Sequence, residues 1–403
     1  MKRLLFVDDD LNVLDGLRRM FYSMRDRWEM EFVTNAEAAL LACAEHPFDI
    51  VVSDLRMPGM DGIELLSVIR DQYPGTARII LSEFAGMELL TRAVSIAYRV
   101  LLKPCNPFEL TETVERIGVL QDVFCKPAMR QFIGALGELP TLSSTYMDLT
   151  RALGQSHTSV STIAKIVGQD VGMSAKMLQV VNSGFFGLSH RATSVEQAVS
   201  YLGTDAIKTL ALHSEAFRMF VPSARIPNSF WEKTQRHSRR TAIIAGTLPV
   251  SREIREATIV AALLHDAGTL ALASTVPEQF CGVLDEMKNR NCSQAEAEEA
   301  RLGTTHAEIG AYLLGLWGIH SVAVEAIAHH HHPSRIKHAG LDCSLAVYLS
   351  NLLAHEVEIH PDGCNGEYLS DTDRRELEAV GLLDQLPVFW DRALEALGEM
   401  VMA

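Results

Sequence analysis

Three aspartates lie where a folded chain would bring carboxylates together. Asp54 follows the short, β-branched apolar run at residues 50–52, within the segment FDIVVSDLRMPGMDG. Asp8 and Asp9 follow another apolar run, at residues 4–7. Such runs, flanked by turn residues, are typical of buried parallel strands, whose carboxyl ends border the ligand crevice of an open α/β sheet. A lone aspartate there would most often cap a turn, but three carboxylates at neighbouring strand ends indicate a site that holds a cation.

The chemistry that suits these carboxylates is the transfer of a phosphoryl group to an aspartate. A carboxylate-rich site with only oxygen ligands prefers Mg²⁺ that keeps several waters. A carboxylate beside such an ion can attack phosphorus and form an aspartyl phosphate. Ser82 and Lys103 follow two further apolar runs, so they are expected at the same edge of the sheet. Ser82 can donate its hydroxyl to a phosphoryl oxygen, and Lys103 supplies a compact positive charge.

The elements that must position these residues alternate between strand and helix. Five short apolar runs are each followed by a segment in which apolar residues recur at helical spacing. Strands are predicted at residues 4–7, 32–33, 50–52, 78–81 and 100–102, and helices at residues 11–21, 35–44, 63–73, 87–97 and 107–120. This alternation predicts an α/β fold with a doubly wound, five-stranded parallel sheet.

Residues 1–122 resemble the receiver domain of two-component response regulators. The resemblance is carried by Val7-Asp8-Asp9, Asp54, Met57-Pro58-Gly59-Met60-Asp61-Gly62, Ser82 and Lys103-Pro104. It implies that Asp54 accepts phosphate from a sensor histidine kinase and that Ser82 and Lys103 sense the phosphoryl group. It also implies that Mg²⁺ is held by Asp8, Asp9, Asp54 and the carbonyl of Arg56. Receiver domains commonly pair through their last helices, so the resemblance further implies a homodimer.

Two positions depart from the receiver pattern. Glu83 follows Ser82 where the family usually has a small residue, which adds a negative charge beside the predicted phosphorylation pocket. Val100 stands where the family often has an aromatic residue, and Tyr98 is nearby but out of register. These departures affect the coupling of Ser82 to an aromatic side chain and leave the predicted phosphorylation of Asp54 unchanged.

The chain from residue 129 to residue 402 is predicted to be all-α. Apolar residues recur there at three- and four-residue spacing, without the alternation that strands show. Helices are expected after Leu139-Pro140 through residue 153, at residues 194–212 and at residues 256–272, with a break at residues 182–187. Because no Gly/Ser-rich linker separates the two halves, residues 123–131 are predicted to continue the preceding helix and to couple the halves mechanically.

Histidines in the all-α half are candidate metal ligands, together with one aspartate and one asparagine. The candidates are His237, His265, Asp266, His306, His329, His330 and Asn351. His265-Asp266 lies at the end of an apolar helix face, and both side chains can reach a metal at the helix edge. Neutral imidazoles and a carboxylate suit Fe, Mn or Zn. A single histidine would more often be a core residue, and His331 and His332 fit surface positions, but a set of this size favours a site.

The order of these residues resembles the HD superfamily of metal-dependent phosphohydrolases, which includes cyclic-di-GMP phosphodiesterases. The wider pattern is similar to an HDOD domain at residues 132–335, followed by a helical extension at residues 336–403. That pattern consists of Leu139-Pro140, Asn182-Ser183, Gln197-Ala198, Leu202-Gly203, Leu263-Leu264-His265-Asp266-Ala267-Gly268, His306, Gly310, Trp317 and His329-His330. The HDOD resemblance implies a signalling and scaffolding module without an established general activity.

Three departures from the phosphohydrolase pattern favour a non-catalytic output. Thr269 stands where the phosphodiesterases carry a Lys, and Asn351 stands where a carboxylate ligand is expected. No Glu and no Gly-Tyr-Pro loop follows His329-His330. These losses weaken metal binding and the stabilisation of a phosphodiester transition state. A receiver-controlled phosphohydrolase that uses the candidate ligands is the alternative.

Composition narrows the classes of partner and the expected compartment. The formal net charge of −15 argues against broad electrostatic binding to nucleic acid or to an anionic membrane. Residues 236–240 hold three arginines, but no basic recognition helix stands out. The seven cysteines form no CxxC pair, and neither a signal-peptide core nor a membrane-length apolar run is present. We therefore expect a soluble cytoplasmic response regulator whose phosphorylated receiver controls how the HDOD half binds an unknown downstream protein.

Overall fold

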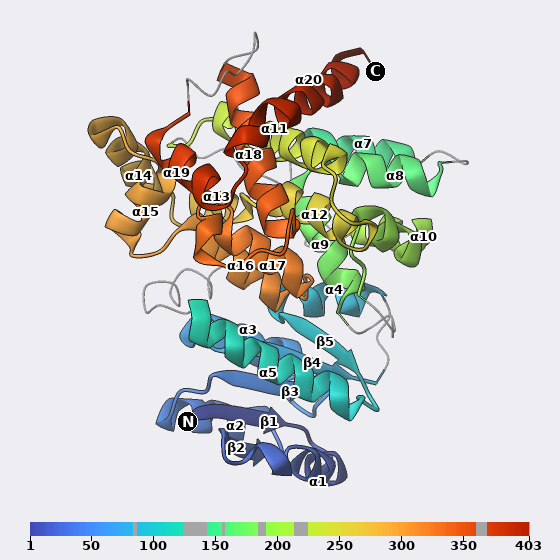
Figure 1. Ribbon diagram of the computed structural model, residues 1–403. Coiled ribbons are helices and arrows are strands. Elements are labelled where there is room, and N and C mark those ends of the chain that lie inside the picture. Colours follow the sequence, from blue (N-terminus) through green and yellow to red (C-terminus); the bar gives the residue numbers. More distant parts are fainter. Residues whose placement is uncertain are drawn as a thin grey trace.

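An α/β domain and a larger body of helices are stacked on each other in the computed structural model (Figure 1). The structure describes residues 1–83, 87–124, 143–154, 158–183, 191–212, 225–359 and 369–402. The N-terminus lies at the far side of the α/β domain, and the C-terminal helix lies at the opposite end of the molecule (Figure 1).

The sheet of the α/β domain brings the predicted reactive residues to one edge. Its five strands are parallel and follow the order β2-β1-β3-β4-β5. The strands are β1 Lys2–Val7, β2 Trp28–Val33, β3 Ile50–Asp54, β4 Ala77–Ser82 and β5 Arg99–Leu102. Val7 pairs with Ser53, Asp54 with Leu81 and Ser82 with Leu102, so the carboxyl ends of four strands meet. The predicted doubly wound parallel sheet is confirmed.

Five helices connect and cover the strands, and three of them begin at a capping side chain. The helices are α1 Leu11–Met20, α2 Ala36–Glu45, α3 Gly62–Gln72, α4 Met87–Ile96 and α5 Pro107–Phe124, with a short 3₁₀ turn η1 at Tyr22–Met24. The side chains of Asp10, Asn35 and Asp61 each accept a hydrogen bond from a backbone N–H of the first turn. Such caps satisfy donors that a helix leaves open at its start. The α5 helix continues past residue 120 through residues 123 and 124, as the predicted helical linker requires, and residues 125–131 lie outside the described residues.

The second half is all-α in its described residues, as predicted. Its helices are α7 Ser143–Leu153, α8 Val160–Val167, α9 Val171–Val181, α10 Val195–Leu212, α11 Asn228–Thr247, α12 Arg252–Leu264, α13 Ala267–Thr275, α14 Pro277–Arg290, α15 Gln294–Leu302, α16 His306–Leu316, α17 Ser321–His329, α18 Cys343–Ile359, α19 Asp371–Ala379 and α20 Leu386–Met402, with 3₁₀ turns η2 Pro333–Arg335 and η3 Leu383–Gln385. Leu139-Pro140 and residues 184–187 lie outside the described residues.

The helix predicted at residues 256–272 is two helices, so that expectation was wrong. The break falls at His265-Asp266, where Asp266 has φ −92° and ψ 10°. Gly268 then brings α13 against α16 so closely that a Cβ would overlap the carbonyl oxygen of His306. Close packing between α13 and α16 therefore overrides the continuous apolar pattern of this segment.

The segment Arg252–Thr275 is long and apolar enough to cross a membrane, but 83% of its apolar window is buried, as in the core helix of a soluble protein.

The two domains share one core. Buried apolar side chains form a continuous cluster from the sheet into α9, α12, α16 and α17, and a second cluster joins α11 to α18 and α20. Leu120 of α5 contacts Gly315 of α16 so closely that a Cβ at Gly315 would lie 2.8 Å from Leu120 Cδ1. Gln179 Nε2 of α9 donates to the Val94 carbonyl of α4 at 3.1 Å. The α4–β5–α5 side of the α/β domain is therefore packed against the helical half (Figure 1).

Candidate functional site

Three carboxylates and one ammonium group meet at the carboxyl end of the sheet. Asp8 and Asp54 are buried and Asp9 is exposed, and one carboxylate oxygen from each lies within 4.8 Å of the others. Lys103 Nζ lies 2.5 Å from Asp54 Oδ1 and 2.6 Å from Asp8 Oδ2. Burial raises the pKa of Asp8, and the hydrogen bond and charge of Lys103 only partly oppose this effect. Burial lowers the pKa of Lys103, but Asp54 and Asp8 outweigh burial and raise it, so Lys103 stays charged.

The loop after β3 fixes the position of Asp54. The backbone N–H of Arg56 donates to Asp54 Oδ2 at 3.0 Å. Gly62 begins α3 directly against β3, where a Cβ would overlap the backbone carbonyl oxygen of Asp54. The Met57 to Gly62 segment thus requires glycine at its end for a packing reason. With its other oxygen on Lys103, Asp54 is held at both carboxylate oxygens.

Ser82 and Lys103 are neighbours across the fourth and fifth strands. Ser82 is the buried last residue of β4, and its carbonyl accepts a hydrogen bond from the backbone N–H of Lys103 at 2.6 Å. Glu83 is exposed and lines a surface cavity together with Lys103. Asp54, Ser82 and Lys103 thus lie at the adjacent ends of three neighbouring strands.

A buried arginine connects the sheet to the helical half. Arg99, the first residue of β5, is 3% exposed, and its Nη1 donates to the backbone carbonyl of Asn182 at the end of α9. Gly318, with φ +88°, lies against the guanidinium, and a side chain there would overlap it. Burial lowers the pKa of Arg99 to about 10, so the group remains charged at neutral pH. An exposed ion pair between Arg191 and Glu112, at 3.2 Å, joins the same two domains.

Asn182 organises the surface that receives Arg99. Its side chain accepts from the backbone N–H of Ala192 at 2.8 Å and donates to the carbonyl of Ala192 at 3.2 Å. These two bonds tie the end of α9 to the segment before α10. The Asn182 of the Asn182-Ser183 motif therefore has a structural role, because it holds in place the carbonyl that Arg99 binds.

A second cluster gathers five of the seven predicted metal ligands and one further histidine, His331. His237, His265 and Asp266 form one group of possible ligand atoms within 4.8 Å, and His306, His330 and His331 form another. Asp266 lies between the groups, because Oδ2 is 3.5 Å from His265 Nε2 and Oδ1 is 3.5 Å from His306 Nε2.

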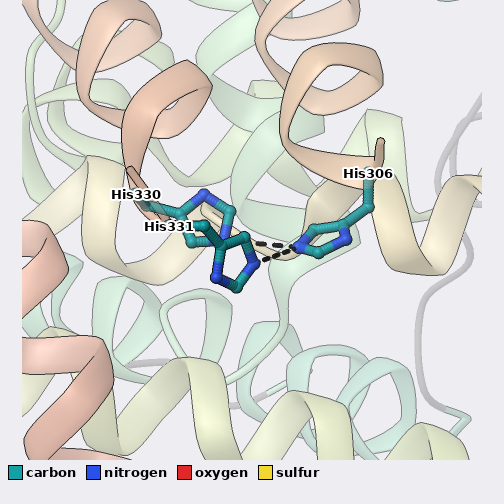
Figure 2. Close-up of side chains that lie close together, drawn as sticks. All are labelled: His306, His330 and His331. Atoms are coloured by element: carbon teal, nitrogen blue, oxygen red, sulfur yellow. Dashed lines mark hydrogen bonds between the residues drawn. The ribbon is translucent and has the colours of Figure 1, made fainter. Parts of the chain in front are cut away.

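The pair that faces His306 is His330-His331, one residue later than the predicted His329-His330. Figure 2 shows the Nε2 atoms of His330 and His331 directed at His306, at 3.3 Å and 2.9 Å from its Nε2. His329 is the last residue of α17 and lines cavities outside the cluster. The helix ends at His329, so the two residues that turn inward are the ones that follow it. The expected surface position of His331 was therefore wrong.

Hydrogen bonds at the opposite ring nitrogen orient these histidines. His330 Nδ1 and His265 Nδ1 each lie 2.7 Å from a backbone carbonyl, of Ile327 and Ala262, and so donate to it. His306 Nδ1 lies 2.6 Å from the carboxylate of Glu298, which is fully buried on α15. In the neutral form of each ring, Nε2 therefore carries a lone pair that points into the cluster.

The charge states of three histidines in the cluster favour metal ligation. Burial, with the neighbouring imidazoles, lowers the pKa of His237 to about 3 and places those of His330 and His331 well below their usual value. These rings are neutral at pH 7. Burial lowers the pKa of His306, but Glu298 and Asp266 outweigh it and raise the value. His265 Nε2 is buried without a hydrogen-bond partner, so the cluster fits a divalent cation such as Fe, Mn or Zn.

Asn351 and Thr269 form hydrogen bonds at the edge of the histidine cluster. Asn351 Oδ1 lies 2.8 Å from His237 Nε2, and as the acceptor it leaves His237 Nδ1 as the free lone pair. Thr269 Oγ1 accepts from Gln294 Nε2 at 2.9 Å, and Gln294 also donates to Glu298. The position of Thr269 thus supports the hydrogen bonds around His306 and brings no cation to the cluster.

Glu298 and His331 escaped the prediction from sequence. Glu298 stands among Glu296 and Glu299, and its charge alone does not separate it from these exposed neighbours. A signal was present, because Glu298 shares the helical spacing of the buried residues Ala295 and Leu302. A carboxylate at an apolar helix position indicates a buried partner, here the imidazole of His306.

Two family models match the chain. Residues 4–115 match the response regulator receiver domain, and residues 139–333 match the HDOD domain. An uncharacterized protein of Treponema pallidum (strain Nichols) is 24% identical over 196 residues, which are 49% of this chain and 38% of that protein. The response regulator protein FleR of Pseudomonas aeruginosa is 28% identical over 189 residues, which are 45% of this chain and 39% of FleR. The chain thus spans about two fifths of the length of these curated relatives.

One solved response regulator is similar over much of this chain at low identity. The MmoQ response regulator from Methylococcus capsulatus is 22% identical, with a TM-score of 0.49, and the match covers 64% of this chain and 98% of that one.

Proposed function

Since the chain is a response regulator that joins a receiver domain at residues 4–115 to an HDOD domain at residues 139–333, we propose that phosphorylation of Asp54 controls the HDOD domain through the docked α4–β5–α5 face. A sensor histidine kinase is the proposed phosphate donor, and the cytoplasm is the proposed compartment. The HDOD domain presents the output surface to a downstream protein.

The acidic pocket supports the phosphoacceptor role. An oxygen of Asp54 attacks the phosphorus of the kinase phosphohistidine, and the P–N bond breaks as the O–P bond forms, so charge and atoms balance. Asp8, Asp9, Asp54 and the Arg56 carbonyl would hold Mg²⁺, which would supply positive charge to offset that of the phosphoryl group. Lys103 neutralises a further oxygen of the phosphoryl group, and Ser82 donates its hydroxyl to it.

The observation that carries the coupling is that two cationic residues, Arg99 and Lys103, lie at the two ends of the β5 strand. Lys103 directly follows β5 and contacts Asp54, whereas Arg99 begins β5 and contacts Asn182 of the HDOD domain. A phosphoryl group on Asp54 moves the partner of Lys103 outward by the length of an O–P bond. Any shift of β5 that follows is transmitted to Arg99, because the strand is short and fully hydrogen-bonded to β4.

Docking also bears on self-association. Receiver domains pair through the face formed by their last helices, and part of that face is covered here by α9, α10 and α16 of the same chain. A homodimer through this face therefore requires that the HDOD domain moves away. We propose the homodimer as a product of phosphorylation.

The second candidate function, metal-dependent phosphohydrolysis, requires metal binding, which is favoured by the unpartnered His265 Nε2 and the inward-facing lone pairs of the histidine cluster. The ligands would be His237, His265, Asp266, His306, His330 and His331, with Asn351 as a hydrogen-bond partner of His237. A bound Fe, Mn or Zn ion would supply a Lewis acid. Thr269 and Asn351 leave the site without the extra cation and carboxylate, so metal binding without turnover is the form we propose.

Phosphorylation is tested with the full chain, acetyl phosphate and Mg²⁺. Intact mass should rise by one phosphoryl group in the native protein and not in Asp54→Asn. Amide hydrogen exchange in α4, β5 and α9 should then differ between the two forms. An unchanged exchange pattern in a protein that is fully phosphorylated would contradict the proposed coupling.

Elemental analysis of the full chain, produced without a His tag, tests metal binding. The double variant His265→Ala/Asp266→Ala should abolish this binding.

A further inference from the structure

A cavity of about 480 Å³ opens next to the histidine cluster, and both domains line it. Helices α15, α16 and α17 and the segment after α17 form most of its wall, including His331 and His332. The remaining part is Val123, which lies on α5 of the receiver domain. The cavity thus joins the input domain to the candidate metal site.

The cavity reaches the cluster through His331. This side chain is half-buried, lines the cavity, and directs its Nε2 at that of His306 at 2.9 Å (Figure 2). By contrast, His265 and His330 are fully buried. A cation that arrives through this cavity therefore meets the imidazole of His331 before those of the inner ligands.

The receiver holds one side of this opening. Val123 is 64% exposed, and Leu120 of the same helix packs on Gly315 of α16. A neighbouring cavity of about 420 Å³ continues along α5 and α17 and shares Val123, Ala328 and His329 with the first. Movement of α5 away from α16 would widen both cavities together.

The charges around the opening select the kind of ligand. Glu296, Glu299 and Glu308 line it, and Arg335 is the one arginine among the lining residues that the structure describes. Hydrogen bonds from Ser293 lower the pKa of Glu296, which therefore stays ionised at neutral pH. An acidic opening concentrates cations and repels phosphate esters. The opening thus suits a free divalent cation better than a nucleotide.

We propose that this cavity is the route by which a divalent cation reaches the histidine cluster, and that α5 of the receiver narrows it. Docking of the receiver then sets the rate of metal exchange. The inference rests on the proposed metal binding and adds a regulatory contact to it.

Stopped-flow absorption of Co²⁺ tests the route in the full chain without a His tag, with Co²⁺ alone as the probe. Val123→Trp should slow uptake by about tenfold, a barrier change of roughly 1.4 kcal/mol, at unchanged final occupancy. Val119→Trp is the matched control, because Val119 is 60% exposed on the same helix and lines only the neighbouring cavity. Its uptake rate should equal that of the native protein. Thermal unfolding of all variants verifies that they are folded.

The double variant Arg99→Ala/Val123→Trp, which also weakens the domain interface, separates the outcomes. Arg99→Ala, which loosens docking, should speed uptake and remove the effect of Val123→Trp. Equal rates in the native protein and Val123→Trp, with normal occupancy, would overturn the route while metal binding stands, and the cation would then enter beside Asp266. Absence of the Co²⁺ bands in every folded variant would overturn metal binding and the route together.

Discussion

Arg99 and Lys103 mark the two ends of one buried strand, and each binds a different domain. Lys103 Nζ is 2.5 Å from Asp54 Oδ1 in the receiver, whereas Arg99 Nη1 donates to the carbonyl of Asn182 in the HDOD domain. A four-residue strand, Arg99–Leu102, therefore connects the contact with Asp54, the proposed phosphoacceptor, to the domain interface. This short connection makes the interface accessible to direct tests.

Replacement of Arg99 should loosen the docked domains. Arg99→Ala removes a charged hydrogen bond and leaves the Asn182 carbonyl without this donor, at a cost of about 1.5–3 kcal/mol in docking. Small-angle scattering should show a larger radius of gyration. Arg191→Ala breaks only the exposed pair with Glu112, worth about 0–1 kcal/mol, and should leave the radius unchanged. Identical radii for Arg99→Ala and the native protein would refute the role of Arg99.

Removal of the Lys103 charge should destabilise the receiver and make its stability depend on Mg²⁺. Lys103→Met leaves the buried carboxylates of Asp8 and Asp54 without their counter-ion, which should lower the free energy of unfolding by about 3 kcal/mol. Added Mg²⁺ should recover more stability in this variant than in the native protein. Asp54→Asn, in contrast, relieves repulsion between carboxylates and should raise stability. Urea unfolding with and without Mg²⁺ measures the free energy of unfolding of the native protein, Lys103→Met and Asp54→Asn.

Two glycines should respond to alanine with opposite signs. Gly62→Ala forces a Cβ into the Asp54 carbonyl oxygen and should cost about 1–3 kcal/mol, as overpacking does. Gly16 of α1 has open space around the same position, so Gly16→Ala should stabilise the helix by about 0.5–1 kcal/mol. Thermal denaturation measures the change in stability of both variants. A neutral Gly62→Ala would show that α3 can shift away from β3.

Glu298 should matter for metal affinity although it is not a ligand. Glu298→Gln keeps the shape of the side chain but removes the carboxylate that accepts from His306 Nδ1, so metal affinity should fall by about 10–100-fold. Glu299→Gln removes an exposed carboxylate from the same helix and should change affinity far less. Titration with Co²⁺ at fixed pH compares the two. Equal affinities would mean that Glu298 only packs.

Two buried thiols should be inert at mildly alkaline pH. Burial raises the pKa values of Cys43 and Cys343 to about 11, so neither forms thiolate at pH 8 in the folded protein. A thiol reagent should modify them only after unfolding. Because the folded pKa exceeds the unfolded value, their contribution to stability is complete below about pH 8.5 and is lost as the pH rises toward 11. Mass spectrometry after labelling at pH 8 identifies the modified cysteines.

The receiver fold and its acidic pocket could be predicted from the sequence. Short apolar runs fix the strands, and parallel strands place their carboxyl ends at one edge, so Asp8, Asp54 and Lys103 converge whatever the details of packing. The helical half was harder, because spacing alone gives helices but not their contacts. Continuous apolar spacing concealed the break at His265-Asp266, which arises where α13 packs against α16.

Tertiary packing alone decided which polar groups are buried and which partners they contact. The sequence determined that this chain has carboxylates at neighbouring strand ends, an alternating α/β half, and a helical half rich in potential ligands. It did not reveal that Arg99 is covered by the other domain, that Glu298 rather than Glu299 reaches His306, or that His331 replaces His329. The physical reason is that periodicity assigns a face within one helix, whereas the partner of that face lies on an element distant in the chain.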